Sequence, residues 1–245
     1  MNILKHYKKL WFFNFNRLKN NNYKLMREYF ADLLIDDVEK FMVIKGKVVL
    51  DVGGARGEFC KVLSEKRNCL AYNLDPNPYE YGAYDDKFIW PQTKVGSAEQ
   101  IPFDSNSVDL VVCRGVLEHI PTGKQQIALN EMFRVAKNGG WCYLAIPPWF
   151  NPTAGHGLKP FHYLPFSWAK AMAEIFYKKK IPACSWQEKR LFSITFSRML
   201  AMIRSSGFEL IATQDVHLKM HFLTKFPILR EFMIPTVAFI LKKNK

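Results

Sequence analysis

A short stretch of glycine and acidic residues carries the clearest chemistry in this sequence. Residues 48–57 read VVLDVGGARG, so an apolar run ends near Asp51. The loop that follows is built from small residues, namely Gly53, Gly54, Ala55 and Gly57. Small residues let backbone N–H groups approach a ligand closely, and the N-terminus of a following helix favours negative charge. The stretch therefore predicts a nucleotide-like ligand at the carboxyl end of a parallel strand.

A second acid follows at the spacing that a ribose site requires. Residues 70–74 predict another strand, which leads into Asp75 and Pro76. In a βαβ unit, an acid about 20 residues beyond the glycine loop can accept hydrogen bonds from both ribose hydroxyls. Nicotinamide cofactors use the same spacing, but their loop reads G-x-G-x-x-G, and Glu58 stands at its last glycine position. A nicotinamide dehydrogenase is therefore the more distant alternative.

These residues need an alternating framework of strands and helices to position them. Apolar runs predict strands at 48–52, 70–74, 93–95, 108–113, 141–146, 208–215 and 236–242. Helical patterns fall near 57–66, 122–136 and 190–206, and Gly139-Gly140 is expected to end the second of these before the fifth strand. The expected fold class is α/β: a Rossmann-like, seven-stranded, mostly parallel sheet with helices on both faces.

Three blocks, in order, resemble the class I S-adenosylmethionine-dependent methyltransferases, in particular the branch of ubiquinone- and menaquinone-pathway enzymes. The first block is the loop within residues 48–59, and the second is the strand ending in Asp75. The third runs from GSAEQIPFD at 96–104 to VLEHI at 116–120. The resemblance covers about residues 45–146 strongly and 200–242 weakly, but not 1–44 or 147–189.

The resemblance implies S-adenosylmethionine as the methyl donor and a set of residues that bind it: Asp51, Gly53, Gly54, Ala55, Gly57, Asp75, Pro76, Ser97, Ala98 and Arg114. Two positions depart from the family pattern. Ala55 replaces the usual middle glycine, which is tolerable at a negative φ. Ser97 stands where many relatives have Asp and would bind the adenine amino group more weakly. Arg114 would neutralise a carboxylate of cofactor or substrate, or would be solvated.

Candidate catalytic groups lie after the fourth strand and in a proline-rich, aromatic segment at 147–189, which we interpret as a substrate or lid insertion. The candidates are His119, His156, His162 and Tyr163. His119 would be a base, a substrate contact or a residue without a role. The histidine spacing lacks cysteine or acid partners, so no metal site is expected.

Composition limits the partners and the cellular location that the protein is expected to have. The net charge of +13 indicates either a polyanionic partner, which would be nucleic acid or an anionic membrane, or a charge that serves only solubility. The five scattered cysteines, and the lack of a signal peptide or membrane span, point to a cytoplasmic protein. The basic, aromatic segments 5–19 and 220–234 suit peripheral membrane contact, stacking on RNA, or packing in the core.

We therefore expect a basic N-terminal extension at 1–46 and a methyltransferase domain at 47–245. The expected function is transfer of a methyl group (EC 2.1.1) to oxygen or carbon of a small or lipid-linked molecule. The alternatives are an RNA methyltransferase and a decayed S-adenosylmethionine-binding module. The oligomeric state stays open.

Overall fold

The computed structural model describes residues 3–16, 22–79 and 88–244. Its strands are β1 (Val48–Val52), β2 (Leu70–Asp75), β3 (Thr93–Val95), β4 (Val108–Arg114), β5 (Ala136–Ile146), β6 (Phe208–Asp215) and β7 (Val237–Lys243). Its α-helices are α1 (Ile3–Asn16), α2 (Asn22–Val38), α3 (Glu58–Arg67), α4 (Gln125–Val135), α5 (Phe166–Tyr177), α6 (Trp186–Lys189), α7 (Phe196–Ser206) and α8 (Pro227–Phe232). Short 3-10 turns are η1 (Leu117–His119), η2 (His156–Leu158), η3 (Phe161–Tyr163) and η4 (His221–Lys225).

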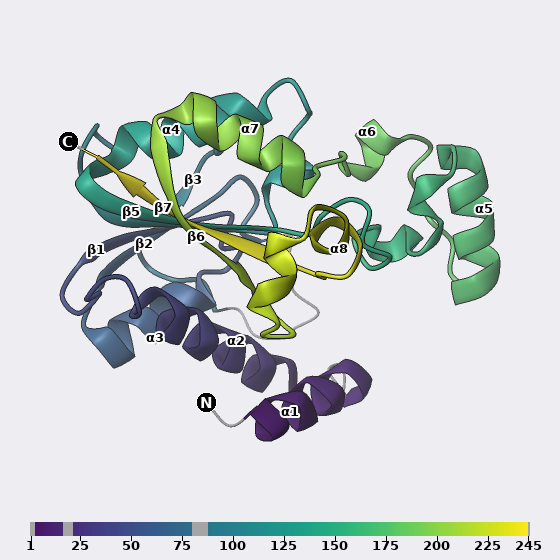
Figure 1. Cartoon of the computed structure of the whole chain (residues 1–245), viewed down its shortest axis with the longest axis horizontal. Coiled ribbons are helices and arrows are strands. Elements are labelled where there is room, and N and C mark those ends of the chain that lie inside the picture. Colours follow the sequence, from purple (N-terminus) through teal and green to yellow (C-terminus); the bar gives the residue numbers. More distant parts are fainter. Residues whose placement is uncertain (1–2, 17–21, 80–87, 245) are drawn as a thin grey trace.

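One seven-stranded sheet organises these elements in the order β3-β2-β1-β4-β5-β7-β6. The pairs from β3 to β5 are parallel, and β7 runs antiparallel to both β5 and β6. Figure 1 shows α4 and α7 on one face of the sheet and α2 and α3 on the other. The expected Rossmann-like α/β class with helices on both faces is confirmed. The carboxyl ends of β1, β2 and β4 meet at one edge, where such sheets bind ligands.

Each face of the sheet buries its own core because alternate strand residues point to opposite sides. Leu50 and Val111 pack into the core that includes α4 and α7. Val49 and Leu110 pack into the core that includes α2 and α3. Cys60, Cys69, Cys113 and Cys142 are free thiols buried in these cores, and Cys184 is exposed.

The N-terminal helices are docked on the sheet domain. Ala31, Leu34 and Ile35 of α2 belong to the core shared with α3. Asp37, at the end of α2, forms a 2.7 Å ion pair with Lys219 in which both side chains are buried. The described parts of the extension expected at 1–46, residues 3–16 and 22–46, therefore pack against the remainder of the protein.

Two local expectations were wrong. Gly139 and Gly140 do not end a helix, because α4 stops at Val135 and β5 already begins at Ala136. The pairing of β5 with β4 shifts register between Val108 and Leu110, so both glycines lie in an irregularity of the strand.

The helix expected from residue 190 begins later, at Phe196. The hydroxyl of Thr195 accepts a hydrogen bond from the Arg198 amide at 3.0 Å and caps α7 there. Residues 191–195 instead run without helical structure.

Within residues 3–16, 22–79 and 88–244, no helix is long and apolar enough to cross a membrane.

Candidate active site

The glycine-rich loop after β1 is bonded directly to the end of β2. The Gly53 amide donates to the Leu74 carbonyl at 2.6 Å, and the Ala55 amide donates to Asp75 Oδ2 at 2.8 Å. The other carboxylate oxygen of Asp75 accepts from the Asn77 amide at 2.8 Å. Each oxygen keeps a second lone pair for a ligand hydroxyl. Asp75 therefore holds the loop in place and can still accept hydrogen bonds from a ligand.

The backbone at Ala55 does not meet the condition under which its methyl group would be tolerable, a negative φ. Its φ is +53°, in the left-handed region. For L-residues this region costs roughly 1–2 kcal/mol. The hydrogen bond from the Ala55 amide to Asp75, and a 2.8 Å bond from the Asn73 side chain to the Ala55 carbonyl, hold this conformation. Glycine is required nearby at Gly53, where φ is +73° and a Cβ would lie 2.2 Å from Val116 Cγ2.

Asp51, which is buried, and Arg114, which is partly exposed, each place a buried polar atom near this loop. Asp51 Oδ2 and Arg114 Nε have no hydrogen-bond partner. Burial raises the pKa of Asp51 to about 6, while the positive charge of Arg114 opposes that shift. The guanidinium of Arg114 also stacks on Phe59, 4.5 Å from the ring centroid. Unpartnered buried polar atoms are costly unless a ligand satisfies them, so both residues fit a role in ligand binding.

A cavity of about 670 Å³ opens at this edge of the sheet, and its size suits a nucleotide-like ligand. Seven of the ten predicted cofactor-binding residues line it, namely Gly53, Ala55, Asp75, Pro76, Ser97, Ala98 and Arg114. Asp51 and Gly54 line an adjoining cavity on the α2 side. Gly57 lines neither cavity; it precedes α3 at a φ of +79° and a Cβ there would lie 2.5 Å from Trp90 Cβ.

Besides Glu99, which lies within the third sequence block, sequence reasoning missed four charged residues of the main cavity: Arg27, Glu188, Lys189 and Arg190. Arg27 belongs to α2, and the other three lie at and just after α6. No local motif marks them, because they reach the cavity only when remote segments pack over the ends of the strands.

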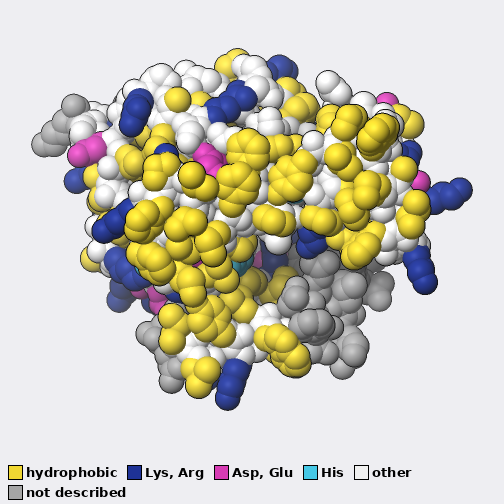
Figure 2. Space-filling view, turned by 45° about the vertical axis from the view of Figure 1, so that its right-hand side comes forward, with side chains coloured by type: hydrophobic (Ala, Val, Ile, Leu, Met, Phe, Trp, Pro, Cys, Tyr) yellow, Lys and Arg dark blue, Asp and Glu magenta, His cyan; other side chains and the backbone are white. Residues whose placement is uncertain are grey.

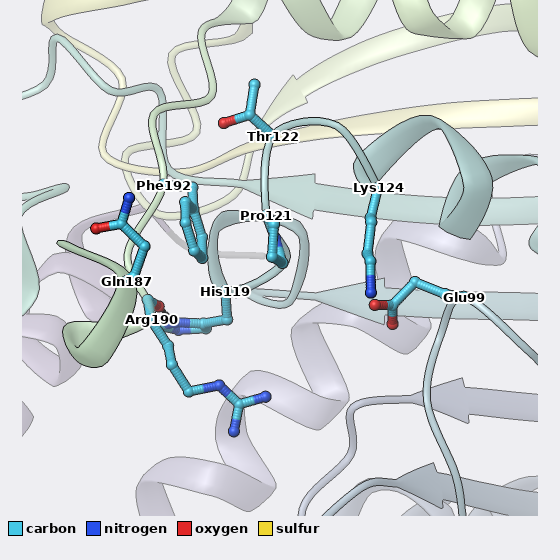
Figure 3. A pocket seen from close by; sticks show the side chains of 8 residues that line it. All are labelled: Glu99, His119, Pro121, Thr122, Lys124, Gln187, Arg190 and Phe192. Atoms are coloured by element: carbon cyan, nitrogen blue, oxygen red, sulfur yellow. Dashed lines mark hydrogen bonds between the residues drawn. The ribbon is translucent and has the colours of Figure 1, made fainter.

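A second hollow of about 600 Å³ adjoins the first and shares Glu99, His119, Pro121 and Arg190 with it. Thr122, Lys124, Gln187 and Phe192 complete its lining. In Figure 3 the side chains of Lys124 and Glu99 point toward one another on one side, and His119 lies near Arg190 on the other. His119 therefore stands between the cavity beside the glycine loop and an outer hollow with a polar, partly cationic wall.

Of the four candidate catalytic groups, the structure brings two together. The rings of His119 and His156 lie 4.9 Å apart between centroids, and both residues line the main cavity. His119 Nδ1 lies 2.6 Å from the Arg190 carbonyl, so Nδ1 carries the proton and donates. Burial lowers the pKa of His119, and it lowers the pKa of His156 to about 4, so both rings are neutral near pH 7.

His162 and Tyr163 do not line either hollow. His162 is buried with Nε2 2.8 Å from the Trp149 carbonyl, and the Tyr163 hydroxyl donates to the Phe150 carbonyl at 2.6 Å. Both side chains stabilise the 147–163 segment. The prediction that they act on substrate is not supported by their positions.

The sheet order, the glycine loop and the acid at the end of β2 together define a Rossmann-like nucleotide-binding protein. A family model described as a methyltransferase domain matches residues 50–144. An uncharacterized methyltransferase of Mycobacterium tuberculosis is 32% identical over 200 residues, covering 80% of this chain and 76% of the relative. An uncharacterized methyltransferase of Mycobacterium leprae is 29% identical, covering 80% and 72%. The chain belongs to the class I S-adenosylmethionine-dependent methyltransferases.

Solved structures share the fold at low sequence identity. A methyltransferase in complex with the Haloferax volcanii Trm112 activator has a TM-score of 0.57 and 17% identity, covering 93% of this chain and 96% of that chain. Geranyl diphosphate C-methyltransferase of Streptomyces coelicolor has a TM-score of 0.54 and 13% identity, covering 87% and 78%. These likenesses confirm the architecture. Methyl transfer from S-adenosylmethionine is thus the activity of the family to which the chain belongs.

Proposed function

We propose that this methyltransferase acts on oxygen or carbon of a small or lipid-linked molecule, at the surface of an anionic membrane. The observation that supports an acceptor of this size is the connection between the two hollows through His119 and Arg190. One hollow holds most of the residues predicted to bind S-adenosylmethionine, and the other offers open space of similar volume directly beside it.

In this proposal, residues of the chain bind S-adenosylmethionine and orient it toward the acceptor. Asp75 would accept hydrogen bonds from ribose hydroxyls, and Ser97 and Ala98 would border the adenine. Asp51 Oδ2 and Arg114 Nε, both unpartnered, would face the charged amino-acid end. When bound, S-adenosylmethionine supplies an electrophilic methyl group on a sulfonium. Holding donor and nucleophile in line is the main contribution such a protein makes to the rate.

His119 is the polar side chain best placed to contact the acceptor. It lines both hollows, and its Nδ1–H is committed to the Arg190 carbonyl. Nε2 therefore carries a lone pair. The 147–189 segment contributes His156, Glu188 and Lys189 to the cavity, which supports its interpretation as a substrate insertion.

An exposed apolar face supports membrane contact. Figure 2 shows hydrophobic side chains gathered over much of the surface that this view presents. We define the apolar face as the exposed side chains of α5 and of the η4–α8 segment: Trp168, Met172, Ile175, Phe176, Phe222, Phe226, Ile228, Phe232 and Met233. Exposed Lys178, Lys179 and Lys180 follow α5 directly, and exposed Lys225 ends η4. Apolar side chains beside cations are typical of proteins that bind anionic interfaces.

The two segments that the sequence suggested for membrane contact, 5–19 and 220–234, contribute unequally to the exposed apolar surface. The 220–234 segment supplies part of the apolar face. In the 5–19 segment Trp11 and Phe12 are exposed, but Phe13 is buried, and residues 17–19 lie outside the part of the chain described. Phe13 therefore belongs to the packing of α1 and does not insert into lipid. Helix α5, which lies outside both segments, supplies the remainder of the apolar face.

Sedimentation with vesicles tests the membrane contact. We expect the protein to pellet with phosphatidylserine-containing vesicles at low salt and to stay in the supernatant with pure phosphatidylcholine. A variant with Ile175→Ser and Phe176→Ser should bind at least about thirty-fold more weakly, because each inserted side chain contributes more than ~1 kcal/mol. Ile127→Ser is the matched control, since Ile127 is exposed on α4 and outside the apolar face. Equal binding by all three proteins would refute contact through this face.

A transfer assay tests the acceptor. S-adenosylmethionine with a tritiated methyl group is incubated with the protein and a cell extract, which is then separated into organic-soluble, small-molecule and RNA fractions. We expect label in one of the first two. Label in RNA, together with binding that weakens steeply with salt, would establish the alternative that the charge of +13 favours. Tight cofactor binding without any transfer would indicate a decayed site.

A further inference from the structure

A carboxylate and two imidazoles converge beside the main cavity, although the sequence predicted no metal site. Glu118 and His119 lie in the 3-10 turn η1 after β4, and His156 begins η2, far along the chain. One potential ligand atom from each residue lies within 4.8 Å of the other two. The distance from His156 Nε2 to Glu118 Oε1 is 3.9 Å.

Glu118 is the least expected member of this group. It is 3% exposed, and its Oε2 is buried without a hydrogen-bond partner. Its backbone carbonyl accepts from the Phe192 amide at 2.8 Å, which fixes η1 against the segment after α6. A buried carboxylate oxygen without a donor costs free energy comparable to a lost charged hydrogen bond. A cation bound at this oxygen or its neighbour would remove that cost.

The ring of His119 has the hydrogen-bonding arrangement that is typical of histidines that bind metal ions. Its Nδ1 donates to the Arg190 carbonyl at 2.6 Å, which leaves the lone pair on Nε2. Metal-binding histidines almost always donate their second ring nitrogen to a carbonyl or carboxylate, because this fixes the tautomer and the ring orientation. Figure 3 shows the His119 side chain beside Arg190 at the wall of the outer hollow.

We propose that Glu118, His119 and His156 bind one divalent transition-metal ion, with at least one coordination position open to the cavity. Two imidazoles and one carboxylate suit Zn²⁺, Co²⁺, Ni²⁺ or Fe²⁺, whereas Mg²⁺ and Ca²⁺ prefer oxygen ligands. Ligands on a tetrahedral ion at about 2.1 Å lie roughly 3.4 Å apart, so Glu118 and His156 must approach by about 0.5 Å and no pair by more than about 1.4 Å. His156 is half-exposed on a short turn, which allows this movement.

The site also refines the role of His119. Resting on the proposed function, the ion would hold an oxygen of the acceptor beside the donor, since His119 and His156 both line the cavity that contains Asp75. His119 would then contact the acceptor through the ion. The fourth position stays available to water or substrate, as it does in metal sites that bind substrates.

Metal titration tests the site without any need for methyl transfer. Tag-free protein is stripped with a chelator, dialysed and titrated with Co²⁺ and Zn²⁺ by calorimetry, while Co²⁺ absorption reports the ligand field. We expect one ion per chain and a visible d–d spectrum of a nitrogen- and oxygen-ligated ion. His156→Gln and His119→Gln should each weaken binding at least ten-fold. His221→Gln and Cys184→Ser are the matched controls, because both residues lie outside the group, and these variants should bind as the wild type does.

Failure of the metal site and failure of the methyltransferase proposal give different results. No stoichiometric ion binding, or equal binding by His156→Gln, would overturn the metal site even if S-adenosylmethionine binds normally. Glu118→Gln completes the series, and thermal melting establishes that each variant is folded. Should Glu118→Gln not fold, the two histidine variants decide the matter alone.

Discussion

The amide of Ala55 donates a 2.8 Å hydrogen bond to the carboxylate of Asp75, so the glycine-rich loop after β1 and the acid that ends β2 form one connected unit. The Asp75→Ala change should weaken S-adenosylmethionine and S-adenosylhomocysteine binding by ~1.5–3 kcal/mol, the scale of a hydrogen bond to a charged group. Calorimetry measures the loss. Asp75→Asn, which keeps the shape and one acceptor oxygen, should lose less. Unchanged affinity in folded Asp75→Ala would refute the ribose assignment.

Because Ala55 has a positive φ, an alanine-to-glycine change there should alter stability in the opposite direction from the same change in a helix. Ala55→Gly should raise the free energy of unfolding by about 0.5–1 kcal/mol, because the relief of the left-handed conformation exceeds the extra flexibility of glycine. Ala201→Gly, the same change on an exposed position of α7, should lower it by about 1 kcal/mol. Urea unfolding measures both. Destabilisation of similar size by both changes would contradict the strain at Ala55.

Asp51 should make stability depend on pH in a direction unusual for an acid. Burial raises its pKa to about 6 in the native protein against 3.8 in the unfolded chain. Between these values the native state keeps a proton that the unfolded state has lost, so stability falls as pH rises through this window. The loss approaches about 3 kcal/mol above pH 6.

The cofactor-free Asp51→Asn variant isolates this effect. Urea unfolding of wild type and variant from pH 4 to pH 7 should show the wild type losing stability relative to Asp51→Asn as pH rises. Stability curves that stay parallel across this range would show that the native pKa of Asp51 is not raised.

The buried ion pair of Asp37 and Lys219 should couple α2 to the loop before η4. In a double-mutant cycle of Asp37→Asn and Lys219→Met, we expect a coupling energy of about 1–3 kcal/mol. Lys40 also pairs with Asp37 but is half-exposed, so Lys40→Met should change stability by less than about 1 kcal/mol. Additive effects of Asp37→Asn and Lys219→Met would mean that this ion pair does not help to dock α2 on the segment before η4.

Local sequence determined the framework of this protein. Strand and loop signals at 48–57 and 70–75 are short-range, because one apolar run, the small residues after it and the next acid lie within a single βαβ unit. Local sequence also predicted β3 and β6, whose observed bounds match the predicted ones. The start of α7 was misplaced because Thr195, rather than the apolar pattern, ends the preceding extended segment.

Only the tertiary structure decided which polar residues share the site. His119 and His156 are brought together by the packing of the 147–189 segment over the strand ends, while His162, six residues from His156, turns to the Trp149 carbonyl. Burial of Glu118 depends on the same long-range packing, because Phe192 and His156 contact it from remote segments. Residue type and spacing specify which elements form, whereas the contacts between remote segments set each side chain's direction, solvation and partners.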